Sequence, residues 1–587
     1  MIKEFITRAK RGENVYLFEV RDAFANGRAA VKCVIEPAVG APRRWVIPLP
    51  PTDCPEEMAF VREYFYANIY NLISTLGGKR MTLYIPPSEK GVETLCAELD
   101  AVFQTALPRG ERTGYGKCLN VTDRVNAAMG CPPFYFEIVR GRCGKEVSPV
   151  GEKRPDALAA FRGAVAAADS LTLCGVDIGG TDINLVVAKN GKIIALKEYD
   201  WRPQDMTKIE QLIDPILLLV RVMRAALALP GTERGDKLRA ALLDKDATDD
   251  QMRTLLEEAR IQHGDFPMLD GIGVNFPDVV IRDKIVGGET LKTRGIRGAS
   301  PDYEAEFGRL VGLGELLLAY CKPGGRFRMA NDGSLAAYTG AVELAHSGHA
   351  REVVDGVFAH TLGTELGTGW IDAGGEIPQI PLEVYNCVID LGNAPARKLD
   401  VFDLRSVCNF NTGIPGTLQK YASQSGAYRL AVEYFSADAP QLYKELLEGS
   451  YIEERDGGVY LSTSPKDMRK ALLERIMELA CTGQPQAERV FREIGRYLAA
   501  TWRETEFILC PKAKRRVLFG RFVKHPRCFE LMQEGASELA DIKLEAGDDS
   551  LAFTPLMQNL KAELNYTVAQ FGQAIGAVYF AANKKTV

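Results

Sequence analysis

The sequence predicts an α/β protein of three units, of which the second and the third begin with the same arrangement. Segments rich in β-branched and aromatic residues alternate with longer segments whose apolar residues recur at helical spacing. GVDIGGTDINLVVA (175–188) is typical of a strand, a polar glycine turn and a second strand. GVFAHTLGTELGTGWI (356–371) repeats this order about 180 residues later.

Composition and charge exclude several classes of protein. The 587 residues exceed what one hydrophobic core usually supports, and 46% apolar with 25% charged residues is typical of a globular chain. A formal net charge of −5 favours neither nucleic acid nor an anionic membrane as a partner. The N-terminal stretch lacks the apolar segment of a signal peptide, and no run of about 18 apolar residues predicts a membrane span. The 13 cysteines lie singly without a C-x-x-C pair, which indicates a reduced, cytoplasmic protein.

The first unit, residues 1–165, is expected to be an α/β accessory domain. Its predicted strands are VYLFEV (15–20), AAVKCVI (29–35), WVIPL (45–49) and RMTLYI (80–85). Helical spacing of apolar residues predicts a helix from Pro55 to about Leu76, and an alanine-rich helix at 156–170 would join this unit to the next.

The second unit, 166–340, has two strands around the Gly-Gly turn, followed by a hairpin at Lys189-Asn190-Gly191-Lys192. A helix at 208–229, a helical insertion near 203–268 and a strand at 269–277 come next. FRMANDGSLAAYTGAVEL (327–344) then predicts a strand end, a polar turn and a helix.

The third unit, 341–587, repeats the strand–turn–strand pattern and is then largely helical from 416 to 509, with an insertion near 430–478. RRVLFGRF (515–522) predicts a strand that ends in a glycine. The closing helix at 564–583 is expected to pack back on the second unit.

The duplicated turn suits a phosphate chain, because glycines let backbone N–H groups approach an anion and a threonine hydroxyl adds a donor. Gly179, Gly180 and Thr181 would supply this in one copy, and Gly363, Thr364 and Gly367 in the other. Asp177, at the end of the preceding strand, could hold Mg²⁺ through water. A Gly-Gly hairpin without a ligand is the better reading of one copy alone, whereas two copies favour phosphate binding.

A second pair of polar residues, Asn331-Asp332, opens a helix of small residues. One interpretation is a helix N-cap, in which an Asn or Asp accepts a backbone N–H bond. The other makes Asp332 a general base that takes a proton from a sugar hydroxyl as the hydroxyl attacks a γ-phosphate.

Taken in order, DIGGT, GIGVNFPD, AND and LGTELGTGWI resemble the repressor–open reading frame–kinase (ROK) family of the actin-like ATPase and sugar kinase superfamily. ACTGQPQAERVFREIGRYLAA (480–500), RRVLFGRF and YTVAQFGQAIGAVYFAA extend the resemblance, which covers about residues 171–587. It implies two ribonuclease H-like lobes with ATP and sugar in the cleft between them.

The resemblance also implies roles for single residues. Asp332 matches the catalytic base, and Asn331, Glu383 (in PLEVYN) and Asn275 (in GIGVNFPD) match sugar ligands. Two further sets match cofactor positions: Asp177, Gly179, Gly180 and Thr181 the first phosphate loop, and Gly363, Thr364 and Gly367 the second. Gly520 matches a glycine near the adenosine.

Several positions depart from the family pattern. Glu365 stands where the second loop has glycine, so it either opposes phosphate or turns away, and Asp182 stands where lysine is frequent. Asn386 replaces a zinc-binding histidine, while Cys387 and Cys408 stand alone, so zinc is not expected. The N-terminal unit has no basic recognition helix, which disfavours DNA binding. Capping of the cleft, homodimerisation and scaffolding remain open as its roles.

The leading hypothesis is therefore a cytoplasmic, ATP- and Mg²⁺-dependent kinase of the glucokinase-like type that phosphorylates a hexose or a hexose derivative. Two alternatives stay open. One is a non-catalytic sugar- or nucleotide-binding regulator with the same fold, and the other is an ATPase or phosphotransferase with a non-sugar acceptor.

Overall fold

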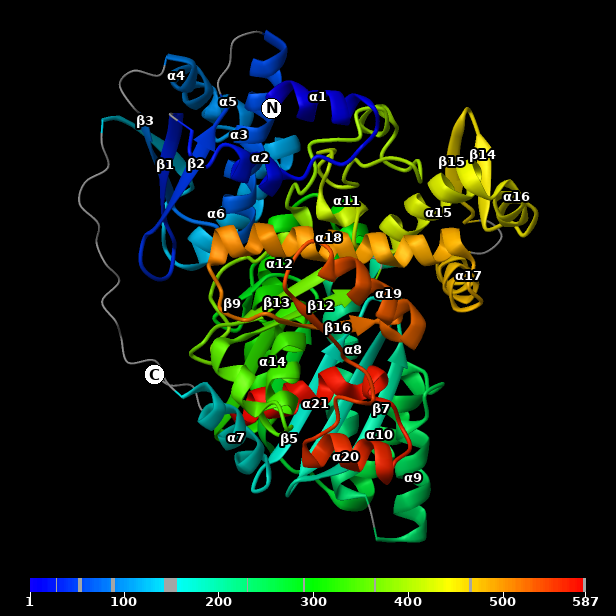
Figure 1. Cartoon of the computed structure of the whole chain (residues 1–587). Helices are drawn as coiled ribbons and strands as arrows, with labels where there is room; N and C mark the ends of the chain where they lie inside the picture. Colours follow the sequence, from blue (N-terminus) through cyan, green and yellow to red (C-terminus); the bar gives the residue numbers. More distant parts are fainter. Residues whose placement is uncertain are drawn as a thin grey trace.

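A computed structural model describes residues 1–27, 29–50, 55–85, 90–141, 156–229, 231–288, 291–363, 366–463 and 467–583. Three larger sheets with helices against them confirm the α/β class. In Figure 1 the N-terminal sheet lies at the top and the sheet of the second unit at the bottom, with that of the third unit between them. We refer to the second and third units as the first and second lobes.

The N-terminal unit is a four-stranded sheet with helices packed against it. Its strand order is β2-β1-β3-β4, with β4 parallel to β3 and the other pairs antiparallel, where the strands are β1 (Ala29–Glu36), β2 (Arg43–Leu49), β3 (Arg80–Ile85) and β4 (Tyr135–Arg140). Its helices are α1 (Ile2–Lys10), α2 (Leu17–Ala23), α3 (Pro55–Leu76), α4 (Lys90–Ala97), α5 (Leu99–Val102) and α6 (Cys118–Ala128).

The strand predicted at 15–20 is wrong, because α2 begins there. Leu17 and Val20 are fully buried, and the Glu19 carboxylate accepts the backbone N–H of Tyr16 (3.2 Å), which caps the helix. Only Tyr16 keeps a strand-like bridge, to Asp390 of the second lobe. Tertiary contacts therefore override the β-propensity of this aromatic and β-branched segment.

The sheet of the first lobe has five strands in the order β11-β8-β5-β6-β7. They are β5 (Thr172–Ile178), β6 (Asp182–Lys189), β7 (Lys192–Asp200), β8 (Leu269–Phe276) and β11 (Cys321–Asn331). Strand β6 is antiparallel to β5 and β7, whereas β8 runs parallel to β5 and to β11. Asn190 and Gly191 have φ of 52° and 71°, the values that the predicted two-residue hairpin requires.

Helices cover the outer face of this first sheet and complete the lobe. They are α8 (Ile209–Ala228), α9 (Glu233–Leu243), α10 (Asp249–His263), α12 (Tyr303–Val311) and α13 (Leu313–Leu318). A short hairpin, β9 (Val280–Ile281) and β10 (Lys284–Ile285), and the helices η3 (Pro203–Asp205), η4 (Leu291–Thr293) and α11 (Arg294–Ala299) lie in the loops of this lobe.

The sheet of the second lobe has the order β13-β12-β16-β17. Its strands are β12 (Val357–Leu362), β13 (Leu366–Ile371), β16 (Arg515–Gly520) and β17 (Lys543–Ala546). Strand β13 is antiparallel to β12, whereas β16 is parallel to β12 and β17 is parallel to β16. This order and these directions match β6-β5-β8-β11, so the two lobes follow one topology.

The stretch 416–509 is mainly helical, as predicted, but it also contains the hairpin β14 (Ile452–Arg455) and β15 (Gly458–Leu461). The helices of the second lobe are α15 (Gln424–Asp438), α16 (Pro440–Glu448), α17 (Arg469–Cys481), α18 (Pro485–Leu509) and α19 (Pro526–Ser537). The N-terminal unit and this lobe share one hydrophobic core, which runs from Ile2 to Leu544.

Four helices, α7 (Ala157–Ala168), α14 (Asp332–Ala345), α20 (Pro555–Ala562) and α21 (Val568–Ala582), form a layer between the sheets of the two lobes. Helix α14 packs on β12 and β13, and α21 packs on β5 and β8. A Cβ atom on Gly175 or Gly273 would lie 1.9 Å from the carbonyl oxygen of Ala574 or Ala577, so glycine lets α21 approach the sheet.

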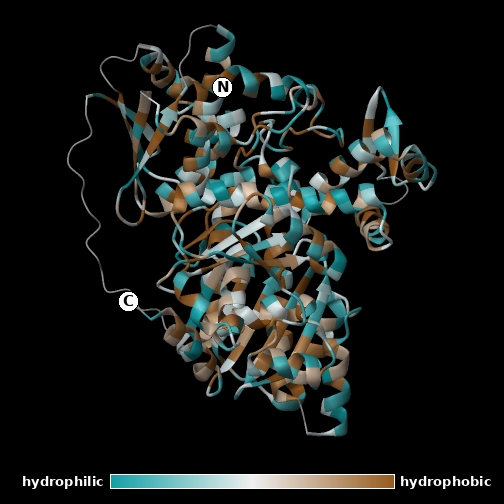
Figure 2. Ribbon diagram, in the orientation of Figure 1, coloured by the Kyte–Doolittle hydropathy of each residue, from teal (hydrophilic) through white to brown (hydrophobic). Residues whose placement is uncertain are grey.

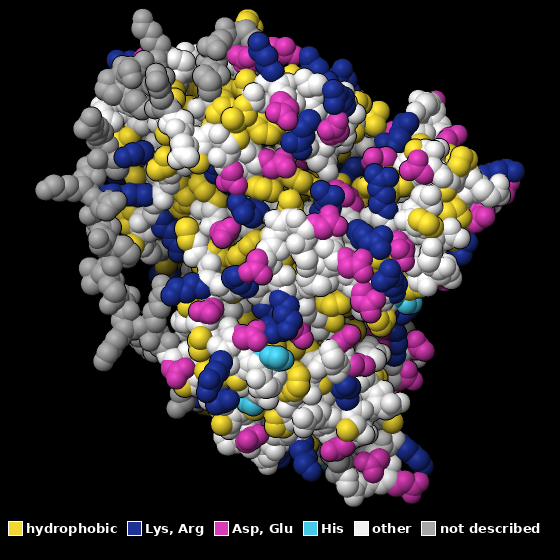
Figure 3. Space-filling model, viewed as in Figure 1, with side chains coloured by type: hydrophobic (Ala, Val, Ile, Leu, Met, Phe, Trp, Pro, Cys, Tyr) yellow, Lys and Arg dark blue, Asp and Glu magenta, His cyan; other side chains and the backbone are white. Residues whose placement is uncertain are grey.

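Surface and hydropathy are those of a folded α/β chain. In Figure 2 the strands and inner helices are brown in many places, and α9 at the lower right shows both teal and brown residues. Basic and acidic side chains are interspersed over the face shown in Figure 3. Among the described helices, none combines the length and the apolar character that a membrane crossing would need.

A buried carboxyl on α14 makes stability depend on pH. Glu343 is 1% exposed and accepts bonds from Phe553 N (2.6 Å), Thr554 N (2.9 Å) and Thr554 Oγ1 (2.6 Å), while burial raises its pKa to about 7. Because the folded protein favours the protonated carboxyl, its contribution to stability is full below the unfolded pKa and is lost as pH rises through about 7.

We predict that Glu343→Gln, which is neutral at every pH, removes this dependence. Relative to wild type, the variant should gain up to about 3 kcal/mol of unfolding free energy between pH 4 and pH 8. Urea unfolding at both pH values measures the difference. A difference between the two proteins that does not change with pH would contradict the assignment.

Candidate functional site

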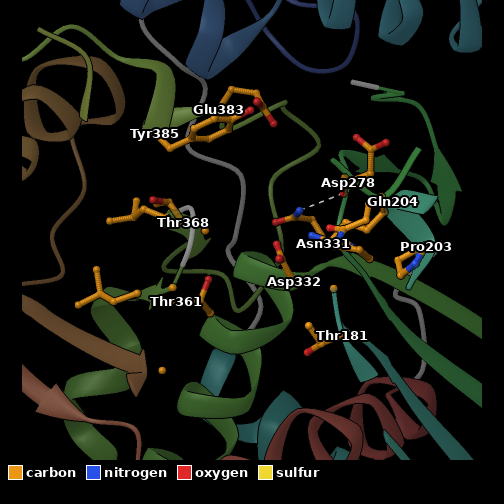
Figure 4. Close-up of a pocket in the computed structure, with 18 of the residues that line it drawn as sticks. Thr181, Pro203, Gln204, Asp278, Asn331, Asp332, Thr361, Thr368, Glu383 and Tyr385 are labelled. Atoms are coloured by element: carbon orange, nitrogen blue, oxygen red, sulfur yellow. Dashed lines mark hydrogen bonds between the residues drawn. The ribbon is translucent and has the colours of Figure 1, made fainter. Parts of the chain in front are cut away.

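A cavity of about 1150 Å³ lies between the two lobes, and the N-terminal unit also reaches it. Figure 4 shows Asn331 and Asp332 at its centre, Glu383 and Tyr385 on one side, and Thr181 on the other. The site residues predicted from the sequence that line the cavity are Gly180, Thr181, Asn331, Asp332, Gly363, Gly367, Glu383 and Gly520. Asp177, Gly179 and Asn275 are not among its lining residues.

The first glycine turn, between β5 and β6, is closed by Gly179. Its N–H donates to Asp182 O (2.8 Å), and its carbonyl accepts the indole N–H of Trp201 (3.1 Å). A Cβ atom on Gly179 would lie 2.6 Å from Asp182 Oδ1. Gly179 therefore shapes the turn, and Gly180 and Thr181 are the residues that face the cavity.

Asp177 lies behind this turn and is held by Asn275, whose Nδ2 donates to Asp177 Oδ1 (2.5 Å). Burial raises the pKa of the Asp177 carboxyl to about 7. The Asn275 bond and the charge of Lys292 lower it, whereas the carboxylates of Asp182 and Asp332 raise it. Asn275, predicted as a sugar ligand, thus contacts Asp177 in the structure.

The structure relates the two interpretations of the helix start to different residues: Asn331 is the helix cap, and the Asp332 side chain is available for another role. Asn331 is the N-cap of α14, because its Oδ1 accepts Gly333 N (3.0 Å) and Ser334 N (3.4 Å), and its Nδ2 donates to Asp278 O (3.0 Å). Asp332 is the first helical residue, and its Oδ1 accepts only Gly333 N (2.8 Å) among the described residues. The cap therefore does not require Asp332.

The second glycine turn faces Asp332 from the other lobe. A Cβ atom on Gly367 would lie 3.4 Å from Asp332 Oδ1 and 2.3 Å from Thr361 Oγ1. Thr361 and Thr368, from β12 and β13, also line the cavity. Thr364 and Glu365 lie outside the described residues. Gly520 closes β16 with φ of 102° and sits against Leu362 O, 2.3 Å from where a Cβ atom would be.

The segment that carries Glu383 is held by helix α3 of the N-terminal unit. Leu382 N donates to Thr75 O (2.9 Å), and Glu383 N donates to Ser74 O (3.1 Å). The Asn71 side chain makes two bonds with the backbone of Val388: its Oδ1 accepts Val388 N (2.7 Å), and its Nδ2 donates to Val388 O (2.8 Å). The N-terminal unit thus supports one wall of the cavity.

The positions compared with the zinc site make other contacts. Asn386 Nδ2 donates to Glu383 Oε2 (3.2 Å), Cys387 pairs with Thr75 Oγ1 (3.4 Å), and Cys408 donates to Arg397 O (3.3 Å). No group of three or more His, Cys, Asp or Glu side chains that could hold a metal ion occurs within the described ranges.

A cation held through water fits the surroundings of Asp177. Asn275 Oδ1 is buried without a hydrogen-bond partner among the described residues. Two further carboxylates, Asp182 and Asp332, raise the pKa of Asp177, and a nearby divalent cation would offset their repulsion. Oxygen donors of this kind are those that Mg²⁺ prefers.

Sequence reasoning missed several lining residues, among them Val121, Gln204, Lys292, Tyr385 and Arg469. They come from elements outside both glycine turns, namely α6, η3, η4, the short helix that follows Glu383 and the start of α17. No local pattern marks them, because only tertiary packing brings such segments to one cavity.

No protein-family model matches the chain, and no curated protein does. Solved structures similar to it include a ROK family glucokinase from Streptomyces griseus in complex with glucose and AMPPNP (18% identity, 70% of this chain and 98% of that one, TM-score 0.38). A ROK hexokinase from Thermus thermophilus (15%, 70% and 98%, 0.34) and a ROK family transcriptional regulator, a homologue of the E. coli MLC protein (15%, 70% and 81%, 0.37), are also similar. Because these identities and TM-scores are low, we transfer no activity or residue role from them.

The position of Asp332 depends on a close backbone contact between the start of α14 and strand β13, and this contact can be tested at Gly369. A Cβ atom there would lie 1.7 Å from Gly333 O, at the start of α14. We predict that Gly369→Ala lowers the free energy of unfolding by about 1–3 kcal/mol, because the helix must move away from β13. Urea unfolding measures the change.

Gly163→Ala is the matched control, since a Cβ atom at this exposed position of α7 meets nothing within 4 Å. This variant should be neutral or more stable by about 0.5–1 kcal/mol. Equal destabilisation by both substitutions would contradict the close contact.

Proposed function

We propose that the chain is a kinase that transfers the γ-phosphoryl group of ATP to a hydroxyl of a hexose or a related sugar. The observation that carries this proposal is the position of Asp332. Its carboxylate lies in a cavity between two lobes of one topology, beside Gly367 of one glycine turn and across from Thr181 of the other. We also propose that the two lobes are ribonuclease H-like lobes of the actin-like ATPase kind, and their shared strand order supports this.

Asp332 would act as the general base. As the sugar oxygen forms its bond to the γ-phosphorus, the bond from that phosphorus to the β–γ bridging oxygen breaks, the sugar proton passes to the Asp332 carboxylate, and ADP leaves. Asp332 is free for this because Asn331 provides the helix cap. Asn331 and Glu383 would orient the sugar, and the glycine turns would hold the phosphates.

Asp177 would hold Mg²⁺ through water, and the ion would neutralise phosphate charge when it is bound. The Asn275 bond fixes the orientation of the Asp177 carboxyl. The N-terminal unit would exclude water, because Val121 of α6 lines the cavity and α3 supports the Glu383 segment.

A non-catalytic sugar-binding regulator is the second candidate. The carboxylates of Asp177 and Asp182 and the occupied Gly179 N–H favour it, since they make the first turn a weaker anion site. An ATPase or a phosphotransferase with a non-sugar acceptor uses the same residues without the sugar.

We predict that Asp332→Asn lowers sugar-dependent turnover about 10²–10⁴-fold, because the amide cannot accept the proton. The measurement is ADP release from Mg-ATP with a panel of hexoses, amino sugars and N-acylated sugars. Asp236→Asn, at an exposed position of α9, is the control and should keep wild-type turnover.

Each result selects a candidate. Undiminished turnover in Asp332→Asn would refute the assigned base, and turnover without any sugar would indicate an ATPase. Sugar binding by the wild type, with no turnover and no ATP binding, would establish the regulator.

A further inference from the structure

Lys292 lies at the first glycine turn, although it is far from that turn in the sequence. It belongs to η4, and its Cε lies 3.6 Å from where a Cβ atom on Gly180 would be. Apart from the chain neighbours of Gly180, no other described atom comes within 4 Å of that point. Lys292 also lines the cavity, and its side chain is partly exposed.

The first turn has a surplus of negative charge. Asp177 and Asp182 flank Gly179, Gly180 and Thr181, and no lysine or arginine occurs between residues 175 and 188. Asp200, paired with Asp182 across β6 and β7, is a third acidic residue, and of the three it is the one that lines the cavity. A triphosphate bound at this acidic turn is repelled unless a positive charge stands close by.

Lys292 can provide that charge because no ion pair occupies it among the described residues. Two other cations line the cavity: Arg469 is engaged with Asp467 at 2.5 Å, whereas Arg202, an exposed residue just after β7, has no ion pair among the described residues. Of the three, Lys292 is the one that comes within 4 Å of the position of a Cβ atom on Gly180. A lysine ammonium is compact, carries three donors and binds phosphate as a point charge.

We propose that Lys292 binds the polyphosphate chain of the phosphoryl donor at Gly180 and so compensates for the acidic first turn. The inference rests on the proposed kinase function and goes beyond it by naming a cation from a separate segment. It assigns the ligand class as a triphosphate. In ATP, the phosphate chain and not the adenosine would contact Lys292.

The test is isothermal titration calorimetry of the full chain with Mg²⁺ and three probes: ATP, inorganic tripolyphosphate and adenosine. Lys292→Met should weaken ATP and tripolyphosphate binding about 10- to 100-fold and leave adenosine binding unchanged. Lys292→Arg should retain most of the affinity. Lys284→Met, at an exposed position of β10 in the same lobe, is the matched control and should bind as the wild type does.

The outcomes separate this inference from the proposed function. If Lys292→Met binds ATP as tightly as the wild type does, the role of Lys292 is overturned and the proposed function is not. The same conclusion follows if the substitution weakens adenosine binding as much as ATP binding. Tripolyphosphate binding without ATP binding, lost in Lys292→Met, supports Lys292 and overturns the ATP-dependent kinase. A wild type that binds neither ATP nor tripolyphosphate overturns both.

Discussion

The candidate site depends on one close backbone approach, between the start of α14 and strand β13. Glycines at 333 and 369 remove the side chains that would keep the two segments apart, and a Cβ atom on Gly333 would lie 2.5 Å from the Thr368 backbone. The helix therefore begins against the second lobe, although the strand before it belongs to the first. This crossing brings Asp332 to the second glycine turn.

Glycines also allow close packing elsewhere in the helical layer between the two sheets. Glycines 175 and 273 bring α21 onto the first sheet, and Gly576 brings it onto α14, where a Cβ atom would lie 1.8 Å from Thr339 Oγ1. Two crossing helices, each packed on one sheet, thus join the lobes at their centre. Because protein interiors are close-packed, these two helices resist displacement against each other.

The N-terminal unit is an integral part of this architecture. It shares a hydrophobic core with the second lobe, and Asn71, Ser74 and Thr75 hold the segment from Leu382 to Val388, which contains Glu383. It also contacts the first lobe, where Arg124 Nη2 bonds Glu304 Oε1 at 2.7 Å. A unit bound to both lobes can restrain their opening, which fits both capping of the cleft and scaffolding among the roles left open by the sequence.

Local patterns in the sequence determined the α/β class, both strand–turn–strand segments, the Asn190-Gly191 hairpin and the helix start at Asn331-Asp332. Each depends on residues a few positions apart, where periodicity and turn chemistry act directly. Only the tertiary structure decided that helix α2 begins at Leu17, that Asn275 holds Asp177, and that Lys292 lies at Gly180. These features arise from contacts between segments distant in the chain, whose free energy depends on packing and burial that no short stretch of sequence encodes.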